Sequence, residues 1–298
     1  MSHVISLDLG GTSLKGALVD EAGAMSFHDE VSTAGQDRDA LIGIILAMIK
    51  KLQSAGEAVG VGLGMPGPLD PFSGTVLTTP NLPFKEPFLM KEVLEKETGL
   101  PVLVNNDANV AVLGEAWLGA ARGAKNVVLL TLGTGIGGGL IIDGELYMGS
   151  NGFGGELGHI TLDADGPACG CGGRGCFEAL ASASAVIRAA QEKIDSSVVD
   201  TKRVAEFAAQ GDATAQEIWN EEGRWLGIAI ASYLNIFNPE YVVLGGGVAG
   251  AWPLFEKSMR AEISSRAFAV MVEHAKIVPA ALGNDAGIIG AGKLVWDK

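Results

Sequence analysis

The opening segment of the chain returns at the start of its second half. Val4 to Thr12 reads Val-Ile-Ser-Leu-Asp-Leu-Gly-Gly-Thr, and Val127 to Gly135 reads Val-Val-Leu-Leu-Thr-Leu-Gly-Thr-Gly. At the same offset, Gly16 to Asp20 falls on Gly139 to Asp143, so apolar runs and glycines coincide along both arms of two predicted hairpins. Two unrelated β-hairpins would share part of this pattern, because strand-glycine-strand is a common motif. A duplication predicts two similar lobes, each with a glycine-rich turn at a shared cleft.

The length and the order of elements favour two domains of the α/β class. Single hydrophobic cores stop growing at about 250 to 300 residues, and this chain has 298 residues, of which 48% are apolar. After the first hairpin, strands and helices alternate. We expect helices over 41–52, 87–97, 179–193, 203–209, 213–237 and 253–264, strands over 59–63, 102–104, 241–244 and 277–280, and a last helix that carries Ile288 to Val295. The predicted domains are 1–119 and 120–298, with the last helix returning to the first domain.

Charge and apolar runs limit the partners and the compartment. A net charge of −14 would repel a phosphate backbone, and no run of Lys and Arg offers a docking stripe, so nucleic acid is not an expected partner. No stretch reaches about 18 uninterrupted apolar residues, and Met1 to Gly10 lacks the features of a signal peptide. We therefore expect a cytoplasmic protein that does not bind a membrane. The three cysteines lie between Cys169 and Cys176, which in a reducing compartment favours metal ligation over disulfides.

Three glycine-rich turns are candidates for nucleotide contacts. Asp8 to Thr12 places a carboxylate at a strand end before two glycines. Such a turn lets backbone N–H groups point at phosphate oxygens while the carboxylate holds Mg²⁺ through its waters, and a tight hairpin turn is the alternative. Gly133 to Gly139 contains more glycine than a two-residue turn requires. Gly245 to Gly247 follows a strand, where a nucleoside-binding turn or close strand-to-helix packing would need glycine. No loop matches Gly-x4-Gly-Lys-Ser/Thr, so P-loop NTPase folds are not indicated.

Asn105 to Asn109 reads Asn-Asn-Asp-Ala-Asn between a predicted strand and a predicted helix. Asn and Asp are preferred N-caps, so capping explains part of this segment. Three Asn residues and an Asp are more than a cap needs. Asn amides can bind sugar hydroxyls, and Asp107 beside an attacking hydroxyl can accept its proton, which is typically worth about 10² to 10⁴ in rate.

Several motifs, spread from end to end of the chain, together resemble the ROK family of bacterial sugar kinases and repressors. They are Asp8 to Lys15, Asn106-Asp107, Gly133 to Gly139, Gly155 to His159, and Cys169 to Glu178. The most specific part, His159 followed by Cys169-x-Cys171-x4-Cys176, resembles the zinc signature of the family. Three thiolates and one imidazole complete a closed tetrahedral site of the structural type. Three buried cysteines without a metal are the alternative, although this glycine-rich segment offers little core for them to fill.

The resemblance implies the two-lobed actin-like ATPase fold, which is ribonuclease H-like, with duplicated lobes and a central cleft. It implies an ATP-dependent hexose kinase, similar to a glucokinase, that transfers the γ-phosphoryl group to a sugar hydroxyl, with C6 of glucose as the expected acceptor. Asp107 would be the general base. The implied sugar ligands are Gly67, Asn81, Asn106, Asp107, Glu156, His159 and Glu178. The residues implied to hold ATP and Mg²⁺ are Asp8, Gly10, Gly11, Thr12, Lys15, Gly133, Thr134, Gly135, Gly137 and Gly246.

The ligands implied for a structural Zn²⁺ are His159, Cys169, Cys171 and Cys176. The zinc ion would position His159 and Glu178 without entering the chemistry. Many relatives carry Trp where this chain has Phe84, so the sugar preference is not copied from them.

Other functions remain open at this stage. Kinases for N-acetylmannosamine, N-acetylglucosamine or fructose would share every residue named, and polyphosphate would be an alternative donor to ATP. The resemblance also suggests a homodimer. A sugar-responsive repressor needs a DNA-reading helix-turn-helix, and Val4 already lies in the first predicted strand. An actin-like ATPase without a sugar acceptor would not need the zinc motif beside Glu156 and Glu178.

Overall fold

The computed structural model of the chain describes residues 2–77 and 82–298, which divide into two compact units. Within the described residues, unit 1 comprises the segments up to residue 123, 139–155 and 281–298, and unit 2 comprises 124–138 and 156–280. The C-terminal segment therefore belongs to the same unit as the N-terminal one. The domain division predicted between residues 119 and 120 stays a prediction.

Unit 1 contains a five-stranded mixed sheet with helices on both faces. Its strands are β1 (His3–Leu9), β2 (Ser13–Val19), β3 (Met25–Ser32), β4 (Ala58–Met65) and β8 (Val102–Asn106), and its helices are α1 (Arg38–Ala55), α2 (Met90–Thr98), α3 (Asp107–Trp117), the short η3 (Gly283–Asp285) and α10 (Ala286–Trp296). The strand order is β3-β2-β1-β4-β8, and β1, β4 and β8 run parallel. A smaller sheet is formed by β5 (Leu69–Asp70), β6 (Thr75–Val76) and β7 (Phe88–Leu89).

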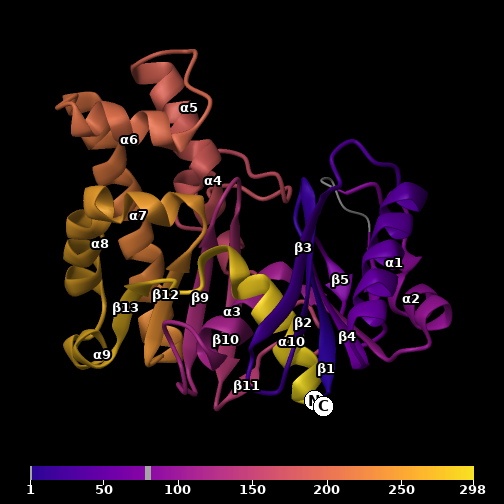
Figure 1. Cartoon of the computed structure of the whole chain (residues 1–298). Helices are drawn as coiled ribbons and strands as arrows, with labels where there is room; N and C mark the ends of the chain where they lie inside the picture. The colour runs from indigo at the N-terminus through magenta and orange to yellow at the C-terminus, as the bar shows by residue number, and fades with distance from the viewer. Residues whose placement is uncertain (1, 78–81) are drawn as a thin grey trace. The chain divides into compact units, whose positions relative to one another are not determined.

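Alternate residues of β1 face two different helical layers. Leu7 and Leu9 are fully buried in an apolar cluster with residues of α1 and α2, and these two helices lie side by side (Figure 1). Ser6 faces the other layer, where its hydroxyl donates a hydrogen bond to the carbonyl of Ile288 in α10. Because successive side chains of a strand point to opposite faces, Asp8 faces α10 as Ser6 does. The register of β1 thus places one carboxylate at the end of α10.

Helices α3 and α10 cross with almost no side chain between them. A Cβ on Gly290 would overlap the carbonyl of Val110, and a Cβ on Gly114 would overlap the carbonyl of Ala286. Glycine at both positions lets the two backbones approach closely. The first turns of α3 and α10 therefore both lie in the layer that faces Asp8.

Unit 2 carries most of a second five-stranded sheet and a group of helices. The strands are β9 (Val127–Leu132), β10 (Ile136–Ile142), β11 (Glu145–Leu146), β12 (Tyr241–Gly245) and β13 (Lys276–Pro279), and the boundary between the units falls within β10. The helices are η1 (Leu157–His159), α4 (Phe177–Ala181), α5 (Ala183–Lys193), α6 (Thr201–Ala209), α7 (Ala213–Phe237), η2 (Gly247–Ala251), α8 (Trp252–Arg266) and α9 (Ala269–His274). The strand order is β11-β10-β9-β12-β13.

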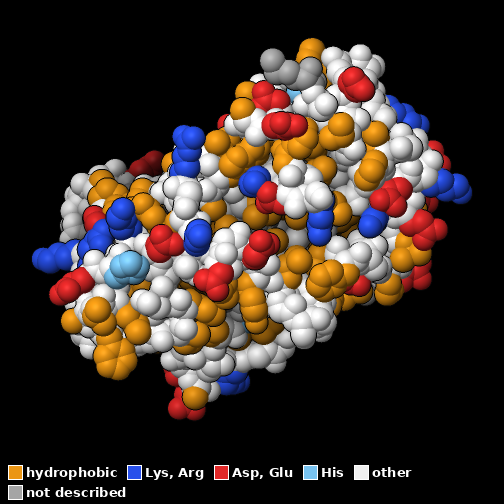
Figure 2. Space-filling view, turned by 90° about the horizontal axis from the view of Figure 1, so that it is seen from below, with side chains coloured by type: hydrophobic (Ala, Val, Ile, Leu, Met, Phe, Trp, Pro, Cys, Tyr) orange, Lys and Arg blue, Asp and Glu red, His pale blue; other side chains and the backbone are white. Residues whose placement is uncertain are grey.

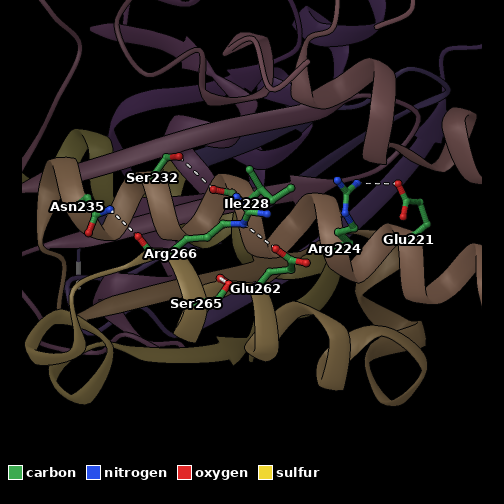
Figure 3. Close-up of polar contacts among 8 residues, drawn as sticks. All are labelled: Glu221, Arg224, Ile228, Ser232, Asn235, Glu262, Ser265 and Arg266. Atoms are coloured by element: carbon green, nitrogen blue, oxygen red, sulfur yellow. Dashed lines mark hydrogen bonds and ion pairs between the residues drawn. The ribbon is translucent and has the colours of Figure 1, made fainter. Parts of the chain in front are cut away.

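Helices α7 and α8 form the longest helix pair of unit 2 and lie side by side (Figure 1). Gly223 and Gly227 allow the close approach, because a Cβ on either residue would overlap backbone atoms of α8. At one end, the Asn235 side chain donates to the carbonyl of Arg266 at 3.3 Å, and the Arg266 guanidinium pairs with Glu262 at 2.6 Å (Figure 3). The contacts with α8 fix the position of α7, whose Tyr233 in turn contacts η1.

The two sheets have the same plan, as the repeat predicted. In each sheet the first strand of the repeat pairs with the second strand, and the fourth and fifth strands follow on its other side. β1 and β9 are the equivalent first strands, and each ends in a glycine-containing turn. The duplication and the α/β class predicted from the sequence are therefore confirmed.

One predicted helix is wrong in its continuity. Residues 179–193 were predicted as a single helix, but α4 ends at Ala181 and α5 begins at Ala183. Ser182 has extended backbone dihedral angles and accepts a hydrogen bond from the N–H of Ala185 through its hydroxyl, so it acts as the N-cap of α5. The break turns the first residues of α5 toward the loop Gly133 to Gly135.

Two further findings concern the surface. On the face shown in Figure 2, Lys and Arg side chains lie among Asp and Glu side chains. Within residues 2–77 and 82–298, no helix combines the length and the apolar character that crossing a membrane requires.

Candidate active site

Asp8 lies at the end of β1 with its carboxyl group against the first turn of α10. A Cβ on Gly287 would come within 2.5 Å of this carboxyl group. Burial and, to a smaller extent, the nearby Asp107 carboxylate raise the pKa of Asp8 to about 6 against the opposing effect of Lys15. Lys15 is the cross-strand partner of Asp8 on β2. Two neighbouring carboxylates repel each other, so a bound cation would stabilise their ionised forms.

The turn after Asp8 is open on its outer side. The N–H of Gly10 donates to the carbonyl of Ser13 at 2.8 Å, which closes the hairpin turn. A Cβ on Gly11 would meet no atom within 4 Å, so the chain itself does not require glycine there. Gly10, Gly11 and Thr12 are exposed. This is the arrangement expected where a ligand approaches the backbone closely, and the phosphate contact of these residues stays a prediction.

Asp107 is the first residue of α3, directly after β8. The N–H of Ala108 donates to the side chains of both Asn106, at 2.9 Å, and Asp107, at 2.8 Å. Asn106 is thus the N-cap of α3, and its amide N–H₂ is the part of the side chain that the cap does not use. Burial raises the pKa of Asp107, while the hydrogen bonds from Ala108 and from its own backbone lower it. A raised pKa makes this carboxylate a stronger base than an exposed aspartate.

Asn105 and Asn109 form a buried brace beneath Asp107. The Asn105 side-chain oxygen accepts from the N–H of Asn106 at 2.8 Å and from the side chain of Asn109 at 3.0 Å. The Asn105 amide also donates to the sulfur of Met148 at 3.3 Å. Both asparagines are almost fully buried. They support the segment that carries Asp107, and neither of them was among the predicted sugar ligands.

Gly67 and Asn81 are two further predicted sugar ligands. Gly67 follows β4 with a φ of +96°, a conformation that favours glycine. Asn81 lies outside the described residues, so its prediction has no structural counterpart.

The Cys and His residues of the predicted zinc motif come together in unit 2. One ligand atom from each of His159, Cys169, Cys171 and Cys176 lies within 4.8 Å of all the others. The Cys169 sulfur lies 3.7 Å from Nδ1 of His159, and the sulfurs of Cys171 and Cys176 are 3.7 Å apart. Tetrahedral zinc with Zn–S bonds of about 2.3 Å requires sulfurs about 3.8 Å apart. The geometry therefore fits a four-coordinate zinc ion.

The electrostatics of the cluster also favour a cation. Burial raises the pKa of Cys169 to about 12, so this thiol stays protonated unless a positive charge lies beside it. The N–H of Gly173 points at the Cys171 sulfur at 3.4 Å. A metal ion supplies the charge that lets several adjacent sulfurs ionise together.

Glu178 connects the cysteine cluster with the second glycine-rich loop. It lies in the first turn of α4, and one carboxylate oxygen accepts from the N–H of Ile136 at 3.0 Å. The other oxygen accepts from the Cys169 thiol at 3.6 Å. A Cβ on Gly135 would overlap the carboxylate, which explains glycine at this position. The predicted sugar contact of Glu178 stays a prediction.

Glu156 and His159 flank the short helix η1. The Tyr233 hydroxyl of α7 donates to the carbonyl of Leu157 at 2.5 Å, so η1 is held from the long helix pair. His159 directs Nδ1 toward Cys169, which leaves Nε2 for another partner. The sugar contacts of Glu156 and His159 stay predictions.

The loop Gly133 to Gly135 is held by the start of α5. The N–H of Ala183 donates to the carbonyl of Gly133 at 2.9 Å, and the Ser184 hydroxyl donates to the carbonyl of Thr134 at 2.8 Å. The N–H of Gly133 donates to the carbonyl of Gly135 at 2.9 Å, so the loop is a closed tight turn with its carbonyls held on one side. Gly137 lies just beyond, in β10.

Gly246 has a reason to be glycine that involves no ligand. Its φ is +84°, and a Cβ would overlap the carbonyl of Leu132. Close packing, one of the two explanations given by the sequence, thus accounts for this residue. A nucleoside contact at Gly246 stays a prediction.

The chain is similar to known proteins along almost its whole length. The ROK family model matches residues 4–298. A glucokinase of Halalkalibacterium halodurans is 40% identical, over 98% of this chain and 94% of that protein. The crystal structure of a ROK hexokinase from Thermus thermophilus superposes with a TM-score of 0.88 at 36% identity, over 99% of this chain and all of that one. A ROK family glucokinase from Streptomyces griseus in complex with glucose and AMPPNP gives a TM-score of 0.85 at 32% identity, with 99% and 100% covered.

Xylose repressors are also related. The Bacillus subtilis protein is 33% identical over 99% of this chain, which matches 77% of the repressor. From its match along almost its whole length, we conclude that this chain belongs to the ROK family and has the two-lobed actin-like ATPase fold of the ROK sugar kinases.

Proposed function

We propose that the chain is an ATP-dependent hexose kinase that phosphorylates glucose at its C6 hydroxyl. The observation that carries this proposal is Asp107, a carboxyl group with a raised pKa at the first residue of α3, in a chain 40% identical to a glucokinase. A carboxylate that is a good base and stands at a strand-to-helix junction suits the removal of a proton from an alcohol.

The proposed reaction is an in-line transfer. The sugar hydroxyl loses its proton to Asp107 as its oxygen bonds to the γ-phosphorus of ATP, and the bond from that phosphorus to the bridging oxygen of ADP breaks. Most of the rate in such reactions comes from positioning and from stabilising charge on the transferring group. The products are a sugar phosphate and ADP.

The residues proposed to hold the nucleotide are those of the two glycine-rich loops. The residues proposed to line the phosphate site are Gly10, Gly11, Thr12, Gly133, Thr134, Gly135 and Gly137, with Lys15 as a nearby positive charge. The N–H groups of Gly10 and Gly133 close their own turns, so the donors to phosphate oxygens are proposed to be N–H groups of the other residues. Asp8 would hold Mg²⁺ through its waters, which fits its position beside a second carboxylate. When bound, Mg²⁺ neutralises phosphate charge. Gly246 is proposed to line the nucleoside site.

The residues proposed to bind the sugar come from both units. Asn106, through its free amide group, and Gly67 and Asn81 are proposed from unit 1. Glu156, His159 and Glu178 are proposed from unit 2. When bound by His159, Cys169, Cys171 and Cys176, a structural Zn²⁺ cross-links these short segments. Nε2 of His159 and the Glu178 carboxylate are then proposed to form hydrogen bonds with hydroxyls of the sugar.

The test is ADP release across a panel of sugars. Purified protein with MgATP would be offered glucose, mannose, fructose, N-acetylglucosamine and N-acetylmannosamine. We expect glucose to give the highest kcat/KM. A higher value for an amino sugar or fructose would keep the kinase but change its substrate, and ADP release unaffected by every sugar would overturn the proposal. Replacing ATP with polyphosphate in the same assay identifies the donor.

The similarity to xylose repressors favours a second candidate, a sugar-responsive regulator. A regulator would bind sugar without ADP release and would bind DNA in a salt-dependent way. The homodimer, the cytoplasmic location and the domains 1–119 and 120–298 remain proposals that rest on the sequence.

A further inference from the structure

Glu115 is a fully buried carboxylate that no predicted function uses. It lies on α3, eight residues after Asp107, and its exposed fraction is 0%. Its oxygens accept hydrogen bonds from the backbone N–H groups of Ala120 at 2.7 Å, Ala281 at 3.1 Å and Leu282 at 2.8 Å. All three of these partners are donors, as a carboxylate requires. Three hydrogen bonds to one buried side chain thus fasten these backbone segments to α3.

The three donors lie at two places where the chain passes from one unit to the other. The chain first leaves unit 1 after Gly123, returns to it for residues 139–155, and enters it for the last time at Ala281. Ala120 precedes the first of these connections, and Ala281 and Leu282 follow the second. One side chain therefore fastens two connections that are distant in sequence to the same helix.

The first connection is also fastened on its other side. The Glu240 carboxylate of unit 2 accepts from the N–H groups of Lys125 at 2.8 Å and Asn126 at 3.0 Å. Between Ala120 and Lys125, Gly123 has a φ of +78°, and a Cβ on it would meet no atom within 4 Å. The N–H of Gly123 donates to the carbonyl of Ala116 at 2.9 Å, so the link between the two fixed points is confined to the residues from Gly123 to Lys125.

The second connection is shorter still. The N–H of Ala280 donates to the carbonyl of Leu244 at 2.9 Å, which fastens it to β12 of unit 2. The next residue, Ala281, donates to Glu115 of unit 1. The fixed points on this connection are consecutive residues, so a change of backbone conformation is confined to the link between them.

Local packing shows that the environment of Glu115 is specific. The carbonyl of Glu115 accepts from the N–H groups of Gly119 and Ala121, both at 3.1 Å. A Cβ on Gly119 would overlap the Glu115 carboxylate. The segment after α3 is folded back on the side chain, which buries the carboxylate and excludes water from its hydrogen bonds.

We propose that Glu115 is a positioning residue for phosphoryl transfer. It fixes both connections to α3, the helix whose first residue is Asp107, and so sets where the base stands relative to the points at which the chain leaves and re-enters unit 1. Eight residues of α-helix span about 12 Å and form a rigid spacer. If a connection is loosened, the position of Asp107 relative to the reacting hydroxyl is less well fixed. A misplacement of about 1 Å can cost 10²-fold in rate. The proposal rests on the kinase function proposed above.

The test compares Glu115→Gln with a matched control, Glu95→Gln. Glu95 is a helical glutamate of unit 1 whose carboxylate also accepts from a backbone N–H, that of Val102 at 3.0 Å, but it lies at neither connection. Glutamine at 115 keeps the size but turns an N–H₂ group toward donors. We expect Glu115→Gln to lower kcat for glucose phosphorylation by about 10- to 100-fold, with a smaller change in KM. Glu95→Gln is expected to keep kcat.

A second measurement does not depend on catalysis. Amide hydrogen exchange of Ala120, Ala281 and Leu282 is expected to accelerate in Glu115→Gln and not in Glu95→Gln. If Glu115→Gln fails to fold, Glu115→Asp, which keeps the charge on a shorter side chain, takes its place in both measurements. An unchanged kcat in a folded variant whose amides exchange faster would overturn the positioning role. Unchanged exchange would overturn the tie itself, and a wild-type protein without sugar-dependent ADP release would instead refute the kinase function.

Discussion

The predicted functional residues of the two units are held in different ways. In unit 1, Asp107 begins a buried helix of 11 residues and is braced from below by the hydrogen bonds of Asn105. In unit 2, His159 and Glu178 lie on η1 and α4, which have 3 and 5 residues. η1 is held by the hydrogen bond from Tyr233, and α4 by the burial of Phe177. His159 and Cys176, the residue before α4, also belong to the cluster of one histidine and three cysteines. The proposed base thus depends on packing and hydrogen bonds, whereas the proposed sugar ligands of unit 2 would depend in addition on a cross-link that a bound metal completes.

The largest effect is expected from a substitution in unit 1 that removes the proposed base and leaves unit 2 unchanged. Asp107→Asn removes the base and is expected to lower kcat by about 10² to 10⁴. Its thermal midpoint should be unchanged or higher, because burial disfavours the ionised aspartate in the folded state. Steady-state kinetics and thermal unfolding check both parts. A variant with near-parental kcat would show that Asp107 is not the base.

The next largest effect is expected from a substitution in unit 2 that removes one of the proposed zinc ligands and leaves unit 1 unchanged. Cys176→Ser removes a buried ligand of the cluster and is expected to abolish bound zinc and to raise KM for glucose by about 10- to 100-fold. KM for ATP should change much less. Zinc analysis of the purified protein and kinetics measure this, with Asp107→Asn as the control that keeps its zinc. If Cys176→Ser retained full affinity for glucose, the metal would have no part in positioning the sugar ligands.

A third prediction concerns the stability cost of the carboxyl group beside Asp107. The pKa of Asp8 is raised from 3.8 to about 6 in the folded state, so its ionisation destabilises the fold above about pH 6. Asp8→Asn should raise the free energy of unfolding at pH 7 by about 1 to 3 kcal/mol.

The gain in Asp8→Asn should shrink as the pH falls from 6 to about 4, because the wild-type group is then protonated in both states. Urea unfolding across this range measures it, and activity should fall because the proposed Mg²⁺ ligand is lost. A variant less stable than wild type at pH 7 would mean that Asp8 has a stabilising partner.

The smallest effect tests the brace beneath the base. Asn109→Ala removes one donor from the Asn105 side chain and should lower the free energy of unfolding by about 1 kcal/mol. Zinc content should not change, because the brace belongs to unit 1. Asn151→Ala, at an exposed position, is the control. Loss of zinc in Asn109→Ala would show that the two regions are not held independently.

The sequence predicted those features that repeat or that follow a local pattern. The duplication and the helix over 213–237 are confirmed by the matching strand orders of the two sheets and by α7. The clustering of His159 with the three cysteines is also found. The break at Ser182 was missed although a serine N-cap signal was present, because the apolar spacing continues on both sides of it.

The remaining features depend on partners far away in the sequence. The donors to Glu115 lie up to 167 residues away, and Asn105 reaches Met148, so no local pattern reveals either role. Glycines were equally ambiguous. Gly11 has open space beside it, whereas Gly246 packs against Leu132 with a positive φ, and only the surroundings distinguish the two.

Phosphoryl transfer from ATP to glucose is tested most directly by phosphorus NMR of the wild-type protein incubated with MgATP and glucose. We expect one phosphomonoester on the C6 oxygen of glucose for each ADP formed, and no comparable loss of ATP when glucose is left out. Conversion of ATP to ADP and inorganic phosphate at the same rate with and without glucose, with no sugar phosphate, would contradict it.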